Sequence, residues 1–179
     1  MAFEAEMEQI FSQNGFDDFK WIDPQEIVVS QWVRMKCIYG CPNYGQSASC
    51  PPNNPSVEDC KAFFRGYQKA VILHFTKQFE NPDDRHTWTK GINMRLVDLE
   101  RETFLVGYEK AFLLAMDSCE LCEECVPERA DCKHPKRSRP TPEGLAVDVF
   151  STVRNVGYPI KVLKDFSEKM NRYAFLMIE

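Results

Sequence analysis

The 179-residue sequence lacks the features that define several common classes of protein. No apolar run approaches the length of a membrane span, and residues 1–8 are acidic with no apolar segment of the kind found in a secretory signal. The net charge of −5 provides no basic surface, which nucleic-acid binding requires. We therefore expect a cytoplasmic protein that binds neither membranes nor nucleic acid.

The sequence also lacks the common catalytic motifs. It contains no Walker loop, no G-x-G-x-x-G fingerprint and no recognisable Ser–His–Asp set. What it does contain is a sizeable apolar fraction, 44%, and eight cysteines. The apolar content predicts one folded domain over residues 1–179. Because nothing indicates export, the cysteines favour metal binding over disulfides.

One cysteine group has the spacing of an iron–sulfur loop. Cys119, Cys122 and Cys125 recur at every third position, and Cys132 follows. A C-x2-C-x2-C run can reach three corners of a [4Fe–4S] cluster, and a later cysteine supplies the fourth. The gap before Cys132 is longer than in bacterial ferredoxins, in which the fourth cysteine of the run ligates the other of two clusters. Cys132 is therefore either the fourth ligand of this cluster or a ligand of another one. Structural Zn²⁺ normally uses two separate C-x2-C pairs, so a zinc ion would leave one cysteine of this triple redundant. Zinc is therefore the second interpretation, and disulfides or free thiols are the third.

A second cysteine group precedes it in the chain. Cys37, Cys41 and Cys50 lie in a stretch rich in glycine and proline, which predicts an irregular loop able to turn thiolates toward a metal. We expect these three to bind a second, distinct cluster. Cys60 falls in a predicted helix and is either the fourth ligand or a small buried hydrophobic residue.

Apolar periodicity predicts an α+β fold with one mainly antiparallel sheet covered by helices. The two cysteine-rich metal-binding loops, 37–60 and 119–135, are expected at one end of that sheet. His74 lies in an expected strand and is interpreted as a hydrogen-bonded core residue. The expected helices are 2–13, 56–67, 85–106 and 142–156, and the expected strands are 16–22, 26–35, 69–76, 108–116, 158–163 and 171–178.

Charged residues near the second group allow two interpretations. The basic run could dock an acidic redox partner or an anionic ligand, or it could offset the negative charge of a thiolate-bound cluster. Acidic residues in the same loop would oppose reduction. Glu143 and Asp148 are either acid–base groups or residues of a solvated helix face near its N-terminus. The basic residues are Lys133, Lys136, Arg137 and Arg139, and the acidic ones are Glu120, Glu123, Glu124 and Glu128.

The motifs together resemble a family of predicted metal-binding proteins, domain of unknown function 2284. The resemblance rests on both cysteine groups, on Cys50-Pro51-Pro52, and on Cys132 and Pro135 followed by Arg139-Pro140, Glu143-Gly144 and Val147-Asp148-Val149. It implies an iron–sulfur cofactor and an origin in anaerobic bacteria or archaea, and it implies no agreed reaction.

Three functions follow from these observations. The first is one-electron transfer to or from a redox partner protein. The second is a redox enzyme or ligand-binding protein that uses an open-site cluster held by Cys37, Cys41 and Cys50. The third is a structural zinc protein that mediates interactions. Whether the chain forms a homo-oligomer is left open by the sequence.

Overall fold

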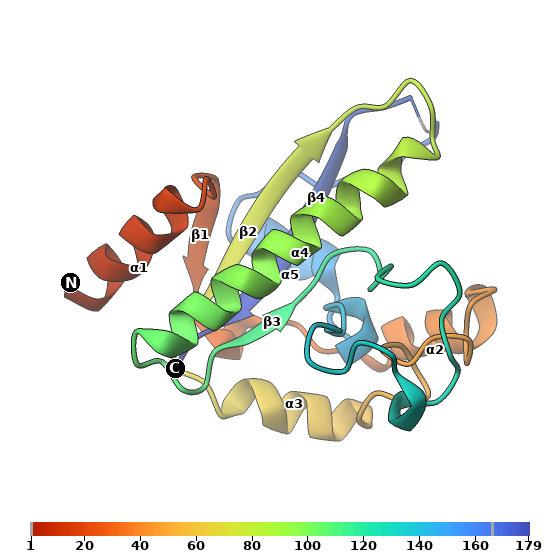
Figure 1. Cartoon of the computed structure of the whole chain (residues 1–179), viewed down its shortest axis with the longest axis horizontal. Helices are drawn as coiled ribbons and strands as arrows, with labels where there is room; N and C mark the ends of the chain where they lie inside the picture. The colour runs from red at the N-terminus through yellow and green to blue at the C-terminus, as the bar shows by residue number, and fades with distance from the viewer. Residues whose placement is uncertain (1, 166) are drawn as a thin grey trace.

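The computed structural model describes residues 2–165 and 167–179. Within these residues, four antiparallel strands form one sheet in the order β1-β2-β4-β3 (Figure 1). This confirms the predicted α+β class with an antiparallel sheet. The strands are β1 (Phe19–Ile22), β2 (Ala70–Lys77), β3 (Phe112–Leu114) and β4 (Met170–Met177). The α-helices are α1 (Ala2–Gln13), α2 (Gln31–Gly40), α3 (Val57–Arg65), α4 (Asp84–Leu105) and α5 (Val149–Asn155), with 3-10 turns η1 (Pro24–Glu26), η2 (Arg129–Asp131) and η3 (Glu143–Leu145).

The central strands β2 and β4 are buried on both faces. Successive strand residues point to opposite sides, so Ile72 faces one apolar cluster and Leu73 the other. In β4, Phe175 faces the same cluster as Ile72, and Leu176 faces the same cluster as Leu73. Two cores therefore sandwich the sheet, which explains why both strands read as continuous apolar runs.

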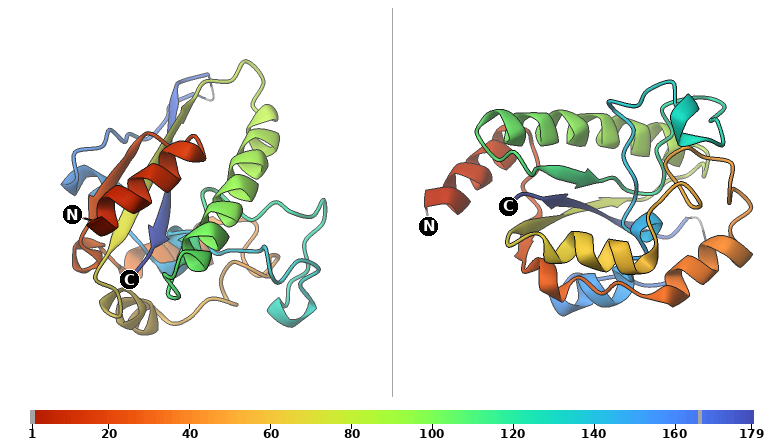
Figure 2. Two further views of the ribbon diagram at one scale, coloured as in Figure 1. Left: turned by 60° about the vertical axis from the view of Figure 1, so that its left-hand side comes forward. Right: turned by 90° about the horizontal axis from the view of Figure 1, so that it is seen from below.

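Helices cover both faces of this sheet. On one side, α1 and α4 contribute Phe11 and Leu96 to the core (Figure 2). On the other side, α3 and α5 contribute Phe64 and Val153. Helices α1, α3 and α4 lie where the sequence predicted them, and the predicted strands at 69–76 and 171–178 are β2 and β4.

The predicted strand at 26–35 is wrong. The chain forms the turn η1 and then the helix α2. Val33 and Arg34 are buried as neighbours while Trp32 and Met35 are exposed, a pattern that a strand with alternating faces cannot produce. Only Val29 keeps the extended pairing, as an isolated bridge to Val147.

Three other segments differ from the prediction. Residues 158–163 form no strand, because Pro159 lacks an N–H group and the Tyr158 amide closes a turn on the Val153 carbonyl at 2.9 Å. Strand β3 begins only at Phe112, after turns that follow Gly107. The predicted helix 142–156 is split between η3 and α5, because Ala146 takes a left-handed conformation with φ of 60°.

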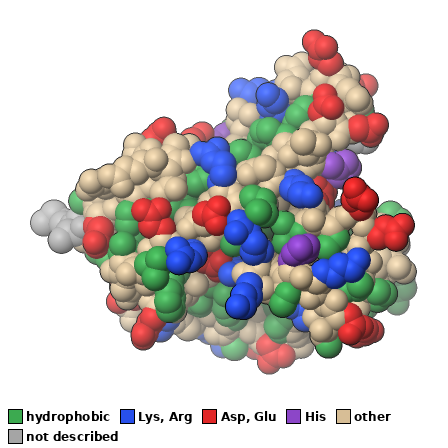
Figure 3. Space-filling model, in the orientation of Figure 1, with side chains coloured by type: hydrophobic (Ala, Val, Ile, Leu, Met, Phe, Trp, Pro, Cys, Tyr) green, Lys and Arg blue, Asp and Glu red, His purple; other side chains and the backbone are tan. Residues whose placement is uncertain are grey.

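Both cysteine-rich segments lie at the same end of the molecule. The loop after α2 and the long loop after β3 run side by side at the right of Figure 1, and both views of Figure 2 keep them adjacent. Figure 3 shows Asp and Glu side chains at several points around the outline, including this edge, whereas Lys and Arg side chains lie mainly over the middle of this face. Within the residues described, no helix combines the length and apolarity needed to cross a bilayer.

Candidate metal centre

The two cysteine segments are anchored by regular structure. Cys37 lies in the last turn of α2, and Cys41 directly follows that helix as its C-terminal cap. The second segment leaves the sheet after β3 and returns where the Ala115 amide donates to the carbonyl of Pro140 at 2.8 Å. This backbone bond closes the base of the loop that carries four cysteines. The loops are irregular, but their starting points belong to the rigid part of the fold.

Six cysteine side chains from the two segments line one cavity of about 830 Å³. The first segment contributes two of them and the second contributes four. They are Cys41, Cys50, Cys119, Cys122, Cys125 and Cys132. Spacing along the chain did not reveal that the two groups face a common space.

Direct contacts tie the two segments together beside this cavity. The thiol of Cys125 lies 3.7 Å from the hydroxyl of Ser47. The side-chain amide of Asn53 donates to the Pro127 carbonyl at 2.6 Å, and its oxygen accepts from the Arg129 amide at 3.2 Å. Asn53 thus fixes the position of one loop relative to the other.

Cys37 and Cys60 do not line the cavity. Burial raises the pKa of the Cys37 thiol; Arg34 opposes this, and the nearby Cys41 and Glu143 add to it. Burial likewise raises the pKa of Cys50, with contributions from Cys37, Cys41 and Cys119. Cys37 lies one helical turn before Cys41, which does line the cavity.

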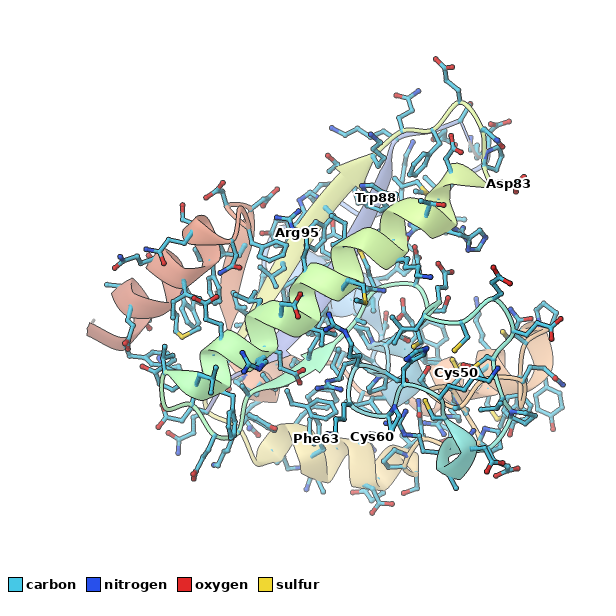
Figure 4. All side chains as sticks on the ribbon, viewed as in Figure 1. Cys50, Cys60, Phe63, Asp83, Trp88 and Arg95 are labelled. Carbon is cyan, nitrogen blue, oxygen red and sulfur yellow. The ribbon has the colours of Figure 1, made fainter. Side chains whose placement is uncertain are left out.

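Cys60 lies in the apolar core. Its residue surface is 1% exposed, and it packs in the apolar cluster that contains Phe64. Figure 4 labels Cys60 near Phe63, beside α3. Its thiol is 3.6 Å from the carbonyl oxygen of Pro55. Burial raises the pKa of this thiol, and Arg34 opposes the shift. The structure therefore separates Cys60 from the six cysteines that share the cavity.

Polar side chains complete the cavity wall. Glu120 accepts a hydrogen bond from Ser118 at 2.8 Å and lies 2.7 Å from the Nδ1 of His86. The thiol of Cys119 contacts the hydroxyl of Ser138 at 3.4 Å, and Arg129 donates to the same hydroxyl at 3.0 Å. A hydroxyl and a guanidinium therefore lie on the side of the cavity that carries Cys119.

Two of the basic residues after Cys132 form ion pairs with helix α4 and do not line the cysteine cavity. Arg137 pairs with Asp98 at 3.0 Å, and Arg139 pairs with the buried Glu100 at 2.6 Å. Both partners lie on α4, so these two arginines fasten the loop to that helix. Lys133 and Lys136 are exposed.

Of the two acidic candidates, Asp148 caps a helix. Its carboxylate accepts from the amide of Ser151 at 3.0 Å and from its hydroxyl at 2.6 Å, at the start of α5. Glu143 instead lines a second cavity of about 250 Å³, whose wall also contains Asp117. The Glu143 residue is exposed overall, yet desolvation by the protein atoms around its carboxyl raises its pKa, and the charge of Asp117 adds to the shift.

Sequence reasoning missed Arg34, which is buried beside Cys37. Arginine three residues before a cysteine lies on the same face if the segment is a helix. The prediction of a strand at 26–35 concealed that relationship. Asn53 was missed as well, and its spacing from the second group gave no signal.

The residues that line this cavity suit a thiolate-bound centre by their chemistry. Thiolates select zinc, copper(I) and iron–sulfur clusters, and the structure gathers six thiols around one space. In the part of the chain that the structure describes, no three His, Cys, Asp or Glu side chains are already arranged around one ion.

Comparison with known proteins identifies the family. The sequence pattern of the family described as "Predicted metal-binding protein (DUF2284)" matches residues 20–178. The chain belongs to this family, which confirms the resemblance based on the cysteine motifs. Searches of curated proteins and of solved structures give no match. The family description specifies metal binding and leaves the metal unnamed.

Proposed function

We propose that this metal-binding protein holds iron–sulfur clusters and passes electrons singly to or from a redox partner protein. The proposal rests on one observation above all: six cysteines from two distant segments line one cavity. A bound cluster would supply the one-electron chemistry. The role of the chain is to provide the thiolates, the hydroxyl contacts of Ser47 and Ser138, and a rigid sheet behind them.

The number of thiols and the size of the cavity favour a cluster over zinc. A structural zinc ion is closed by four ligands at about 2.0–2.3 Å. Six cysteines exceed that need, and about 830 Å³ is far more space than one such ion occupies. The C-x2-C-x2-C run of Cys119, Cys122 and Cys125 suits the corners of a cubane.

The shared cavity also bears on the number of clusters. We expect Cys119, Cys122, Cys125 and Cys132 to hold one [4Fe–4S] cluster, and Cys37, Cys41 and Cys50 to hold a second. The proximity of the two groups supports clusters close enough to exchange electrons. Two cubanes require about eight irons per chain, whereas one requires about four.

Metal and sulfide analysis of anaerobically purified protein tests the proposal. We expect iron and acid-labile sulfide in equal amounts, and a visible absorption that bleaches on reduction. Stoichiometric zinc without sulfide would contradict electron transfer and favour the structural zinc protein instead. About four irons per chain, with Cys37, Cys41 and Cys50 reacting as free thiols, would contradict the second cluster alone.

The second cavity supports a second candidate function, a redox enzyme with an open-site cluster. Asp117 lines both the cysteine cavity and the 250 Å³ cavity, where its carboxylate pairs with Arg172 at 2.7 Å. If the function is enzymatic, small anionic ligands should change the electron-spin signal of the reduced protein; an unchanged signal favours simple electron transfer.

A further inference from the structure

Arg34 is a buried cation held by carbonyl groups. The residue is 9% exposed, on the face of α2 that packs against the body of the protein. Its Nη2 donates to the carbonyls of Pro55 at 3.1 Å and Gly144 at 3.0 Å. Its Nε is buried and has no hydrogen-bond partner among the described residues. The guanidinium is thus fixed in place with donor capacity unused.

No carboxylate forms an ion pair with Arg34 in residues 2–165 and 167–179. Arg137, Arg139 and Arg172 provide the contrast, because each of them pairs with an aspartate or glutamate. A buried charge without a counter-ion is strongly unfavourable, because carbonyl dipoles replace only part of its hydration. The position of Arg34 therefore calls for an anion that the protein side chains do not supply.

The groups near Arg34 indicate which anion it is. Cys37 lies one helical turn further along α2, and the Cys60 thiol shares the Pro55 carbonyl with Arg34. The charge of Arg34 acts on both thiols. A thiolate-bound metal centre beside Cys37 would supply the missing negative charge.

We infer that Arg34 is the buried counter-ion of the metal centre, a positioning residue that sets the charge balance of the cysteine cavity from behind Cys37. This inference rests on the proposed metal–thiolate function and adds a residue that determines its redox properties. A cation fixed in a medium of low dielectric constant interacts more strongly than one in water. Because reduction adds negative charge, Arg34 favours the reduced form and raises the midpoint potential.

Lys36 provides a matched control. It lies on the same helix, next to Cys37 in sequence, but its side chain is exposed and rests over the ring of Trp32 at 5.4 Å. Water and salt screen such a charge. Arg34→Gln and Lys36→Gln remove the same formal charge near the same cysteine, and they differ in burial.

The experiment is a redox titration of the anaerobically purified full chain, with iron and zinc counted per chain for each variant. Arg34→Gln should shift the midpoint potential to more negative values or lose iron, whereas Lys36→Gln should match the parent protein. Arg34→Lys keeps the charge but disrupts the two carbonyl contacts, and it should keep a potential close to the parent value. If Arg34→Gln does not fold, the comparison of Arg34→Lys with the parent protein decides.

Three outcomes overturn the inference. One is an Arg34→Gln protein with unchanged potential and iron content. Another is an Arg34→Lys protein whose midpoint potential shifts as much as that of Arg34→Gln, because the role of Arg34 would then lie in hydrogen bonding. Where Arg34→Gln does not fold, any shift of the Arg34→Lys potential away from the parent value has the same meaning. The third is a parent protein that binds no metal, which ends the proposed function too.

Zinc in place of iron would separate the two proposals. The electron-transfer proposal would then fail, and the role of Arg34 would be tested by competition with a chelator. Arg34→Gln should release zinc at a lower chelator concentration than Lys36→Gln does. Equal release from both variants would overturn the inference independently.

Discussion

The side-chain amide of Asn53 donates a hydrogen bond to the backbone carbonyl of Pro127 at 2.6 Å, across 74 residues of sequence. Asn53 also donates to the Ser47 carbonyl at 3.2 Å and accepts from the Arg129 amide. One side chain therefore links both cysteine loops. We expect the alignment of the six thiols around one cavity to depend on this link.

Replacing Asn53 should loosen the loops. Asn53→Ala removes three bonds worth about 1 kcal/mol each, so we expect the free energy of unfolding to fall by about 3 kcal/mol and iron content to drop. The exposed Asn155 is the control, because among the residues described its side chain makes no hydrogen bond and it does not line the cysteine cavity. Denaturant unfolding and metal analysis measure both effects. Equal behaviour of Asn53→Ala and Asn155→Ala would show that the link is dispensable.

Cys122 and Cys60 should respond differently to substitution. Cys122→Ser removes a thiolate from the cavity wall and should abolish or convert one cluster, seen as lost iron and an altered visible spectrum. Cys60→Ala removes a core thiol that behaves as a small hydrophobe, so it should keep iron and lose about 1 kcal/mol of stability. Unchanged iron in Cys122→Ser, or the loss of a whole cluster in Cys60→Ala, would reverse this assignment.

Metal removal should affect the loops and spare the sheet. Because ligands on long loops are ordered by their metal, we expect residues 37–52 and 117–140 to lose protection in the metal-free protein. Strands β2 and β4 are buried on both faces and should keep theirs. Hydrogen exchange before and after chelation measures this difference. Identical protection of the loops in both states is the result that the proposal does not allow.

The cap of α3 should be worth more than the cap of α2. Ser56 accepts from the amide of Asp59 at 3.1 Å, whereas Ser30 begins α2 without a side-chain cap bond. Ser56→Ala should therefore lower the free energy of unfolding by about 1 kcal/mol, and Ser30→Ala by much less. Thermal denaturation of the two variants provides the comparison, and equal losses would contradict the assigned caps.

Stability should fall at alkaline pH. Burial, and then the nearby Asp18, raises the pKa of Tyr173 to about 12, whereas an unfolded tyrosine loses its proton near pH 10. The folded state therefore holds a proton that the unfolded state releases, so the stabilisation is complete below pH 10 and is lost as pH rises toward 12.

The expected slope from this tyrosine is about 1.4 kcal/mol per pH unit. Tyr173→Phe should flatten the decline, whereas Tyr39→Phe should leave it unchanged, because Tyr39 is 81% exposed. Unfolding free energies measured between pH 9 and about 12 test the difference. A slope that is the same in all three proteins would exclude a contribution from Tyr173.

The sequence predicted the elements that depend on local pattern, and it failed where tertiary packing decides the secondary structure. The strands β2 and β4 were predictable because burial on both faces demands continuous apolar runs. The Asp23–Pro24 break and the β-branched residues Ile27 and Val29 favoured a strand ahead of Cys37, yet packing of Val33 and Arg34 against the body of the protein selects a helix. That choice depends on residues more than 100 positions away, such as Gly144.

The candidate site shows the same difference between what local pattern and what tertiary packing determine. The C-x2-C-x2-C spacing indicated a metal loop because ligand spacing is local chemistry. The meeting of Cys50 with Cys119 depends on where α2 and β3 end, and on the bonds of Asn53. Sequence spacing carries no information about those contacts. The two groups were therefore predicted as separate sites, although the fold places them around one cavity.

The sheet order β1-β2-β4-β3 also determines when this site can assemble. Strand β3, which leads into the second cysteine loop, pairs only with β4 in the described sheet. Residues 170–177 are synthesised after all eight cysteines have left the ribosomal peptidyl-transferase centre. Until then β3 has no strand beside it, and the four cysteines that follow it have no fixed base. Translation order thus separates making the ligands from positioning them.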